Sequence, residues 1–419
     1  MLQCPTARRC VASFVLASSI SAQGQVFVVD DDGGPGVDFL GVQEAVDAAS
    51  QGDLVLIHDG FYPLAVVTKG VTLAAADGAQ PVVEAIRILA VHPPQRVVLR
   101  GLETLAPSTT SALVIESASA QVWVEDCRLL HFNTPISTGD RRGAEIQAGS
   151  DVSFLRCEIT GADASIPFFI PLASAEGIHA VDSDVHVFES TIHGGKRSSN
   201  GHPAPYGEEG VVVDGGFFFA SGSSIVGGDG TDGSCQPFGG GQTAPGDGAD
   251  SLVLQGASPQ VYTLDTTLAG GLGGVPADCG EPPFSPGANG APVSTLAGSH
   301  VPLAGASRHM LVQGPEVEGE LADLEFHGEA GDVTFLVAGF ETTSLFLEPL
   351  AGTQLVAEPF VVLPMGTLDA TGQLATSIPL GLLGGAVEFV SMYAQAAMVA
   401  PDGVYLAGGS VLTILSASL

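Results

Sequence analysis

Large apolar residues recur along the chain in a frame that repeats every 30 to 43 residues. Each repeat has apolar side chains at offsets 0, +2 and +7 from its first apolar residue, and a small side chain at +5. The five first residues are Val122, Val152, Val185, Phe218 and Val261. Apolar residues at offsets 0 and +2 show the alternation of a strand with one buried face. The inward-facing positions change from even to odd offsets before +5, so the chain must turn a corner there. Such a period predicts stacked coils rather than one globular core.

A second pair of apolar residues precedes each of these first residues and predicts a second strand in every coil. The pairs are Leu113/Ile115, Ile146/Ala148, Ile178/Ala180, Val211/Val213 and Leu252/Leu254. Alternate residues of a strand face opposite sides, so both strands place their apolar side chains inside the coil. We therefore expect the five first residues to lie over one another in a single interior file.

A helix is predicted before the first coils, from about Phe39 to Ala49. Val42 and Val46 continue its apolar face, and Asp38 is a candidate N-cap. This helix is expected to cover one end of the stack, because an uncapped end would expose apolar side chains and unpaired strand edges.

The sequence that follows the helix resembles a known superfamily. The run Ala45 to Ile57, with Gly60-Phe61-Tyr62 and Lys69 to Leu73, is similar to the opening of right-handed parallel β-helix proteins of the pectate-lyase-like superfamily. The resemblance covers residues 26 to 295 and implies an all-β solenoid with an N-terminal capping helix. It implies no single activity, because the superfamily includes lyases, hydrolases, esterases, epimerases and adhesins.

Residues 1–22 are predicted to be a secretory signal peptide. Arg8 and Arg9 precede the apolar run Cys10 to Leu16, and Ile20-Ser21-Ala22 offers a cleavage site. No other stretch approaches the roughly 20 apolar residues of a membrane-spanning helix. The mature chain is therefore expected to be secreted or exposed at the cell surface, without a transmembrane segment.

The rest of the chain is divided into residues 23–295 as the β-helix, 296–309 as a linker and 310–419 as a β-sandwich. Short alternating segments between Gly, Pro and Asp turns are typical of a sandwich. The segment Ile378 to Gly385, with Tyr393 to Ala396 and the final strand, resembles an accessory domain found at the C-terminus of secreted bacterial repeat proteins.

Acidic residues dominate the charge, with 46 Asp and Glu against 13 Lys and Arg and a net charge of −33. This balance argues against nucleic acid or an anionic membrane as a partner. It suits divalent cations, saline surroundings or plain solubility.

Four cysteines remain after the signal peptide, in a compartment where disulfides form. Cys235 and Cys279 lie 17 and 18 residues after the first residues of adjacent coils, so stacking of their loops predicts a disulfide. Cys127 and Cys157 both occupy offset +5. A disulfide is geometrically possible there, but Ser and Thr continue the same column, which favours a ladder of small side chains.

Four of the five residues at offset +1 have rings: Trp123, His186, Phe219 and Tyr262. They face outward at the spacing of the coils, so they could stack on successive sugar rings of a polysaccharide. The alternative is that the C-terminal domain or the Gly-rich loops cover this face.

Basic and histidine residues concentrate between Arg141 and Glu209, and Arg156 and His179 are candidate ligand-binding residues among them. They could hold an anionic sugar, or they could pair with acids on neighbouring coils. The catalytic patterns of polygalacturonases and pectate lyases are not matched, since Trp123-Val124-Glu125-Asp126 lacks the histidine of the lyase pattern. No catalytic residue is therefore assigned.

Calcium is the one cofactor that the sequence suggests. Asp229, Asp232, Asp247 and Asp250 are flanked by glycines that permit tight turns rich in oxygen ligands. The same pattern also fits solvated turns without a metal.

These observations favour a non-catalytic exported protein that binds an extracellular polysaccharide or a cell-surface partner along the solenoid. The alternative is a polysaccharide lyase or glycoside hydrolase that uses the patch between Arg141 and Glu209. Both hypotheses depend on which surfaces the folded chain leaves open.

Overall fold

The structure is a computed structural model in which part of the chain is described. The described residues are 24–107, 110–116, 118–131, 141–147, 149–163, 175–196, 207–235, 242–279, 284–385 and 387–419. The predicted signal peptide lies outside this set, and so do Ala148, Arg197 and His202.

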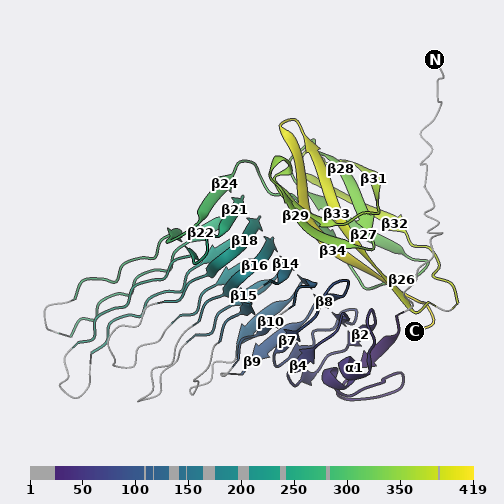
Figure 1. The fold of residues 1–419 in the computed structure, drawn as a ribbon, viewed down its shortest axis with the longest axis horizontal. Helices are drawn as coiled ribbons and strands as arrows, with labels where there is room; N and C mark the ends of the chain where they lie inside the picture. Colours follow the sequence, from purple (N-terminus) through teal and green to yellow (C-terminus); the bar gives the residue numbers. More distant parts are fainter. Residues whose placement is uncertain are drawn as a thin grey trace.

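The N-terminal two thirds of the chain form a parallel β-solenoid with three strands in each full coil (Figure 1). One face holds β1 (Val26–Val29), β2 (Leu54–Ile57), β5 (Thr72–Ala75), β8 (Arg96–Arg100), β11 (Gln121–Glu125), β14 (Asp151–Leu155), β21 (Gln260–Leu264) and β24 (Ser299–Leu303). A second face holds β4 (Ala65–Val67), β7 (Ile86–Leu89), β10 (Leu113–Glu116), β13 (Ala144–Ile146), β20 (Leu252–Gln255) and β23 (Val293–Thr295). The long strands β16 (Ile178–Phe188) and β18 (Val211–Ser221) run through both faces and join them into one 16-stranded sheet.

The third face is a separate 8-stranded parallel sheet. It holds β3 (Phe61–Tyr62), β6 (Val82–Val83), β9 (Glu103–Ala106), β12 (Arg128–His131), β15 (Glu158–Thr160), β17 (Thr191–His193), β19 (Ser224–Val226) and β22 (Thr267–Ala269). The sequence pattern predicted two strands before each corner, and this sheet follows the corner. Strand β24 lies inside the predicted linker, so the solenoid extends to Leu303.

The predicted interior file is confirmed. Val122, Val152, Val185, Phe218 and Val261 pair residue by residue across adjacent parallel strands. All five side chains are buried in one continuous core. The same register places Val97 beside Val122, so the file continues into the less regular coil before it.

A single residue makes the corner between the first and third faces. The residue at offset +4 has a positive φ of about 46° to 67° in six successive coils, at Gly101, Asp126, Arg156, Glu189, Gly222 and Asp265. This left-handed conformation turns the chain in one step and produces the change of parity. Four of the six are not glycine, although the conformation costs an L-residue roughly 1–2 kcal/mol.

The small side chains at offset +5 form a hydrogen-bonded ladder inside the corner. Ser190 Oγ accepts a bond from Cys157 N–H (2.9 Å), and Ser223 Oγ accepts one from Ser190 N–H (3.1 Å). Cys127 and Cys157 are buried free thiols. The predicted ladder of small side chains is therefore confirmed, and Cys127 and Cys157 do not form a disulfide.

One short helix, α1 (Val42–Ala48), covers the N-terminal end of the solenoid core, with Val42, Ala45 and Val46 buried. Its N-cap is Gly41 rather than Asp38. The prediction of Asp38 was wrong because its carboxylate accepts the N–H of Val28, which ties the chain before the helix to β1.

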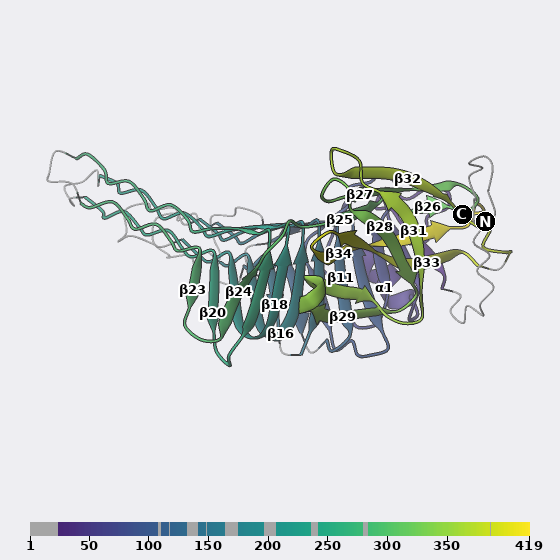
Figure 2. The same ribbon diagram turned by 90° about the horizontal axis from the view of Figure 1, so that it is seen from above.

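Glycine-rich segments of successive coils project from the solenoid as an arm (Figure 2). Segments 161–163, 194–196, 227–234 and 270–279 run outward, and segments 175–177, 207–210, 243–250 and 284–292 return. Every third residue of 227–234 donates its N–H to the outgoing segment of the next coil, at 2.8 to 2.9 Å. A period of three is that of polyproline II chains, which need glycine wherever they touch.

The predicted disulfide between Cys235 and Cys279 is present in the arm, with Cα atoms 5.6 Å apart. It links the outgoing segments of the last two coils. Closing a loop of this length stabilises the native state by roughly 4 kcal/mol in the chain-entropy model.

The C-terminal part forms sheets packed face to face. One sheet holds β25 (His309–Val312), β27 (Leu321–His327) and β32 (Gln373–Pro379), and the other holds β26 (Glu316–Val317), β34 (Gly403–Leu415), β33 (Phe389–Ala400), β28 (Val333–Gly339) and β31 (Phe360–Thr367). A separate hairpin of β29 (Thr342–Leu347) and β30 (Gly352–Val356) lies against β33 and β34, with a 3-10 helix (Glu348–Leu350) between its strands. Met310, Phe326, Ala396 and Met398 lie in the core between the sheets.

Candidate functional site

The outward ring column is covered by the C-terminal sheets. Trp123, His186 and Phe219 are at most 4% exposed, and Tyr262 is half-buried beside them. Phe346 from β29 lies over this column, with its ring centroid 5.1 Å from that of Phe219 and 4.5 Å from that of Tyr262. The interpretation of the column as an open surface for sugar rings is therefore incompatible with the packing. The packing agrees with the alternative, in which the C-terminal domain covers this face.

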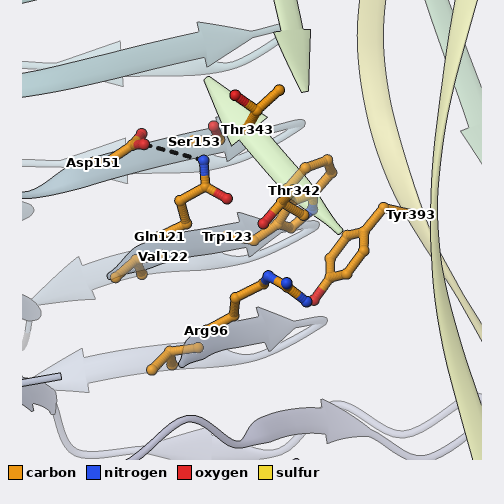
Figure 3. A pocket seen from close by; sticks show the side chains of 10 residues that line it. Arg96, Gln121, Val122, Trp123, Asp151, Ser153, Thr342, Thr343 and Tyr393 are labelled. Atoms are coloured by element: carbon orange, nitrogen blue, oxygen red, sulfur yellow. Dashed lines mark hydrogen bonds between the residues drawn. The ribbon is translucent and has the colours of Figure 1, made fainter. Parts of the chain in front are cut away.

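Alternation within β33 explains how one strand serves two interfaces. Ala394 and Ala396 face the core between the C-terminal sheets, whereas Tyr393 faces the solenoid and meets Trp123 at a centroid distance of 5.4 Å. Figure 3 shows this contact beside Arg96. The cavity there measures about 10 Å³, which is at the lower limit for one water molecule. This small cavity has no room for a sugar.

A buried carboxylate joins the two parts of the molecule. Glu125 is fully buried, and its Oε1 lies 2.5 Å from Arg156 Nη2 and 3.8 Å from Arg100 Nε. Its Oε2 accepts the N–H of Val411 (2.8 Å) and Trp123 Nε1–H (3.0 Å). Ser410 Oγ also donates to Glu125 Oε1. Glu125, at offset +3 of its coil, therefore anchors β34 to the solenoid.

Arg156 serves this junction rather than a ligand. Its guanidinium pairs with Asp126 at 2.8 Å and donates to the carbonyl oxygens of Met310 (3.2 Å) and Gly409 (3.3 Å). Burial opposes the charge, but Glu125 and Asp126 outweigh it and raise the pKa of Arg156. The ligand-binding prediction for Arg156 is corrected, because these bonds commit its donors to the interface.

Glu189 lies in the next coil at the same corner. Burial raises the pKa of this carboxyl to about 8, and Asp126 and Glu125 add to the rise although Arg156 opposes it. The unfolded chain would release this proton near pH 4.5. The stability that Glu189 contributes is therefore present below pH 4.5 and is lost as the pH rises towards 8.

We predict that Glu189→Gln raises the free energy of unfolding at pH 7 by about 2 kcal/mol, after allowance for partial exposure. The amide keeps the shape of the side chain and has no proton to lose. Urea denaturation at pH 7 and pH 4.5 measures this, and the gain should vanish at the lower pH. Glu320→Gln, at an exposed position, serves as the control and should change neither value. A gain of equal size at both pH values would contradict the assignment.

A second polar cluster lies on the outer side of β13 and β16, at the base of the arm. We define it as Arg142, Glu145, Glu176, His179 and Glu209. Arg142 Nε donates to Glu176 Oε2 at 2.9 Å, and its Nη1 lies 3.5 Å from Glu145 Oε1. His179 stands beside Glu145 in the strand register, with its Nδ1 3.5 Å from Glu176 Oε1. Of the patch predicted from sequence, the structure brings together His179, Arg142 and Glu209.

The two carboxyls nearest the arm have opposite pKa shifts. Burial raises the pKa of Glu176, but the contact with His179 and the charge of Arg142 outweigh it and lower the pKa to about 2. Burial also raises the pKa of Glu209, and the charges of Glu176 and Asp250 add to this rise. Glu176 is therefore ionised at every physiological pH, whereas Glu209 holds its proton to a higher pH than usual.

Both ring nitrogens of His179 are buried; Nδ1 faces Glu176 Oε1 at 3.5 Å, and Nε2 has no hydrogen-bond partner among the described residues. A buried polar group without a partner costs roughly 1–3 kcal/mol, so its presence calls for an explanation. The cluster offers carboxylate acceptors and a guanidinium donor around this imidazole. Hydroxyl groups, which both donate and accept, would satisfy such a set.

The four Asp residues proposed for calcium accept backbone amides of the next coil. Asp229 and Asp232 accept the N–H groups of Leu272 (2.9 Å) and Val275 (2.8 Å). Asp247 and Asp250 do the same for Ala288 (2.7 Å) and Ala291 (2.6 Å). In the part of the chain that the structure describes, no three His, Cys, Asp or Glu residues are placed to hold a metal. The four carboxylates are therefore not brought together, and the calcium site remains a prediction.

A larger groove of about 340 Å³ lies on the other side of the junction, between the turn Ala75–Ala79 and residues 311–314. Its volume suits a small ligand. Among the described residues that line it, Arg100 is the one cation, and its guanidinium already donates to the carbonyl oxygens of Val411 (2.6 Å) and Val312 (2.8 Å). The groove therefore offers mainly carboxylates and backbone, and the cluster around His179 is the stronger candidate.

Comparison with known proteins adds little to this description. No protein-family model and no curated protein matches the chain. Among solved structures it is similar to the tailspike protein of Acinetobacter phage vB_ApiP_P1, with a TM-score of 0.21 and 9% identity over 87% of this chain and 83% of that chain. A similarity this low says nothing about activity. Within the described residues, no helix is long and apolar enough to cross a membrane.

Proposed function

We propose that this chain is an exported, non-catalytic protein that binds a neutral polysaccharide at the cluster around His179. The observation that carries the proposal is the buried imidazole of His179, whose Nε2 lacks a hydrogen-bond partner among the described residues and which lies between carboxylates and Arg142. The His179 side chain is 16% exposed, so a small rotation of its ring would let Nε2 meet a sugar hydroxyl as the missing partner. The base of the arm then becomes the binding surface, in place of the covered ring column.

The charges of the cluster favour a neutral ligand over an anionic one. Glu145, Glu176 and Glu209 outnumber Arg142, and the whole chain has a net charge of −33. A uronate polymer would meet like charges at the site and over the rest of the surface. Neutral hydroxyls carry no such repulsion.

Binding to a panel of neutral and uronate polysaccharides tests the proposal. We expect His179→Ala to weaken binding of a neutral polymer at least tenfold, which is about 1.4 kcal/mol. The matched control is His92→Ala, an exposed histidine on a different coil, which should bind like the wild type. Equal binding by both variants, or a preference for uronates, would contradict the proposal.

A glycoside hydrolase is the second candidate, and the opposite pKa shifts of Glu176 and Glu209 favour it. Glu176 and Glu209 hold equivalent positions on adjacent coils, and a retaining glycosidase needs two carboxyls on one surface. Glu176 would then be the nucleophile and Glu209 the acid. New reducing ends in the same polysaccharide panel, lost in Glu176→Gln while binding persists, would establish this activity over simple binding.

A further inference from the structure

The last coil of the solenoid ends in an open surface. We define this terminal layer as β22, the arm segments 270–279 and 284–292, and residues 293–303, which include β23, Leu296 and β24. Among the described strands, each of these three pairs on one side only, with β19, β20 and β21 respectively. The opposite end of the core is covered by α1. The C-terminal hairpin reaches Tyr262 of β21 on the first face, and Leu303 of β24 packs against the same cluster. Figure 2 shows β23, on the second face, away from the C-terminal sheets.

The terminal layer is nearly free of charge in an otherwise charged chain. Between Thr266 and Ser307 there are two acidic residues and no basic one, although 14% of the whole chain is charged. Large apolar side chains are exposed instead, at 72% for Leu296, 64% for Leu272 and 65% for Val275. Exposed apolar side chains beside unpaired strand edges mark an interface.

The Asp residues of the arm are replaced by apolar residues at this layer. The positions that follow Asp229, Asp232, Asp247 and Asp250 in the next coil are Leu272, Val275, Ala288 and Ala291. Each Asp accepts an amide of the coil after it, and the last coil has no coil after it. Loss of the acid needs no partner, but solvent alone would favour polar residues there rather than Leu and Val.

We propose that a second copy of this chain docks on the terminal layer, end to end about a two-fold axis. Two chains of net charge −33 repel each other over most of their surface, and this layer is where they can approach without that repulsion. The two-fold arrangement pairs open end with open end and leaves both capped ends outside. Such a contact closes at two copies instead of growing into a filament.

Sedimentation velocity over a range of concentrations tests this proposal. The wild type is expected to form a dimer that becomes tighter as salt screens the repulsion. Leu296→Asp and Leu272→Asp, at exposed positions, each place a charge at the contact and should raise the dissociation constant at least tenfold. Leu40→Asp is the matched control, because Leu40 is 60% exposed near the capped end. It should dimerise like the wild type.

Circular dichroism establishes that the Asp variants are folded before their association is compared. A wild type that stays monomeric at every concentration would overturn the proposal. An unchanged dimer in both Leu296→Asp and Leu272→Asp would also overturn it, because association would then use another surface. The polysaccharide assay with His179→Ala is independent of all these outcomes.

Discussion

Replacing Glu125 with glutamine is expected to lower the free energy of unfolding by about 4 kcal/mol, because it leaves buried guanidinium groups without their counter-charge. Arg100 has only a 7% exposed side chain and loses the one carboxylate paired with it among the described residues. Arg156 keeps Asp126. Urea denaturation at pH 7 measures the loss, and protease cleavage between Leu303 and His309 shows whether the C-terminal sheets loosen first.

The control for this variant is Glu103→Gln. Glu103 pairs with Arg128 at 2.6 Å, but Arg128 is half exposed, so this ion pair should contribute less than about 1 kcal/mol. Similar losses in the two variants would show that burial of the Glu125 pair has no special weight. A loss below about 1 kcal/mol in Glu125→Gln would mean that the interface is held by apolar contacts alone.

The same carboxylate predicts a sensitivity to acid. Burial raises the pKa of Glu125, but Arg100 and Arg156 outweigh it, helped by the bonds from Ser410 and Val411, so the pKa is lowered. The stability it contributes is present above the unfolded pKa of 4.5 and is lost as the pH falls through the folded value. Wild type and Glu125→Gln should therefore converge in stability at strongly acidic pH.

Replacing Gly228 with alanine is expected to disrupt the arm at a cost of about 3 kcal/mol. A Cβ atom there would overlap the carbonyl oxygen of Gly195, which belongs to backbone and cannot rotate away. The Gly228 N–H bond to Glu208 (2.7 Å) and the Ala249 N–H bond to Gly228 (2.9 Å) cross between outgoing and returning segments. Both would break if the chains moved apart.

Amide hydrogen exchange is the appropriate measurement, because the arm can open without the solenoid. Faster exchange in Gly228→Ala should spread over segments 207–210 and 243–250 and leave the interior file protected. Gly385→Ala carries the same chemical change at a position with no atom within 4 Å of the new Cβ, so it should exchange like the wild type. Unchanged exchange in the arm of Gly228→Ala would contradict the close packing of its segments.

Local and repeated features were predictable from the sequence. The interior file, the corner before offset +5 and the disulfide between Cys235 and Cys279 all follow from one repeat, because stacking places equal offsets of adjacent coils side by side. The capping helix was located, but its N-cap was not. Asp38 bonds to β1, and a pattern of residue types cannot show which of two nearby amides a carboxylate accepts.

The polar cluster could be found only in part. His179 stood out as a histidine in a basic patch, whereas Glu145 and Glu176 were overlooked because they lie on different coils. Their signal was available in the register that places Glu145 beside His179. Glu125 was considered only as part of an imperfect lyase pattern, and nothing in its repeat indicated that two arginines and β34 would surround it.

By itself the sequence determined which side chains face the interior of the solenoid, since alternation and period are properties of each coil and its nearest neighbours. Only the tertiary structure decided which outward face stays open. Trp123 and Phe219 are buried by strands more than 100 residues away in the chain, and no repeat within the solenoid encodes where those strands dock. Surface chemistry depends on such distant contacts, and so the ring column became an interface while the cluster around His179 became the candidate site.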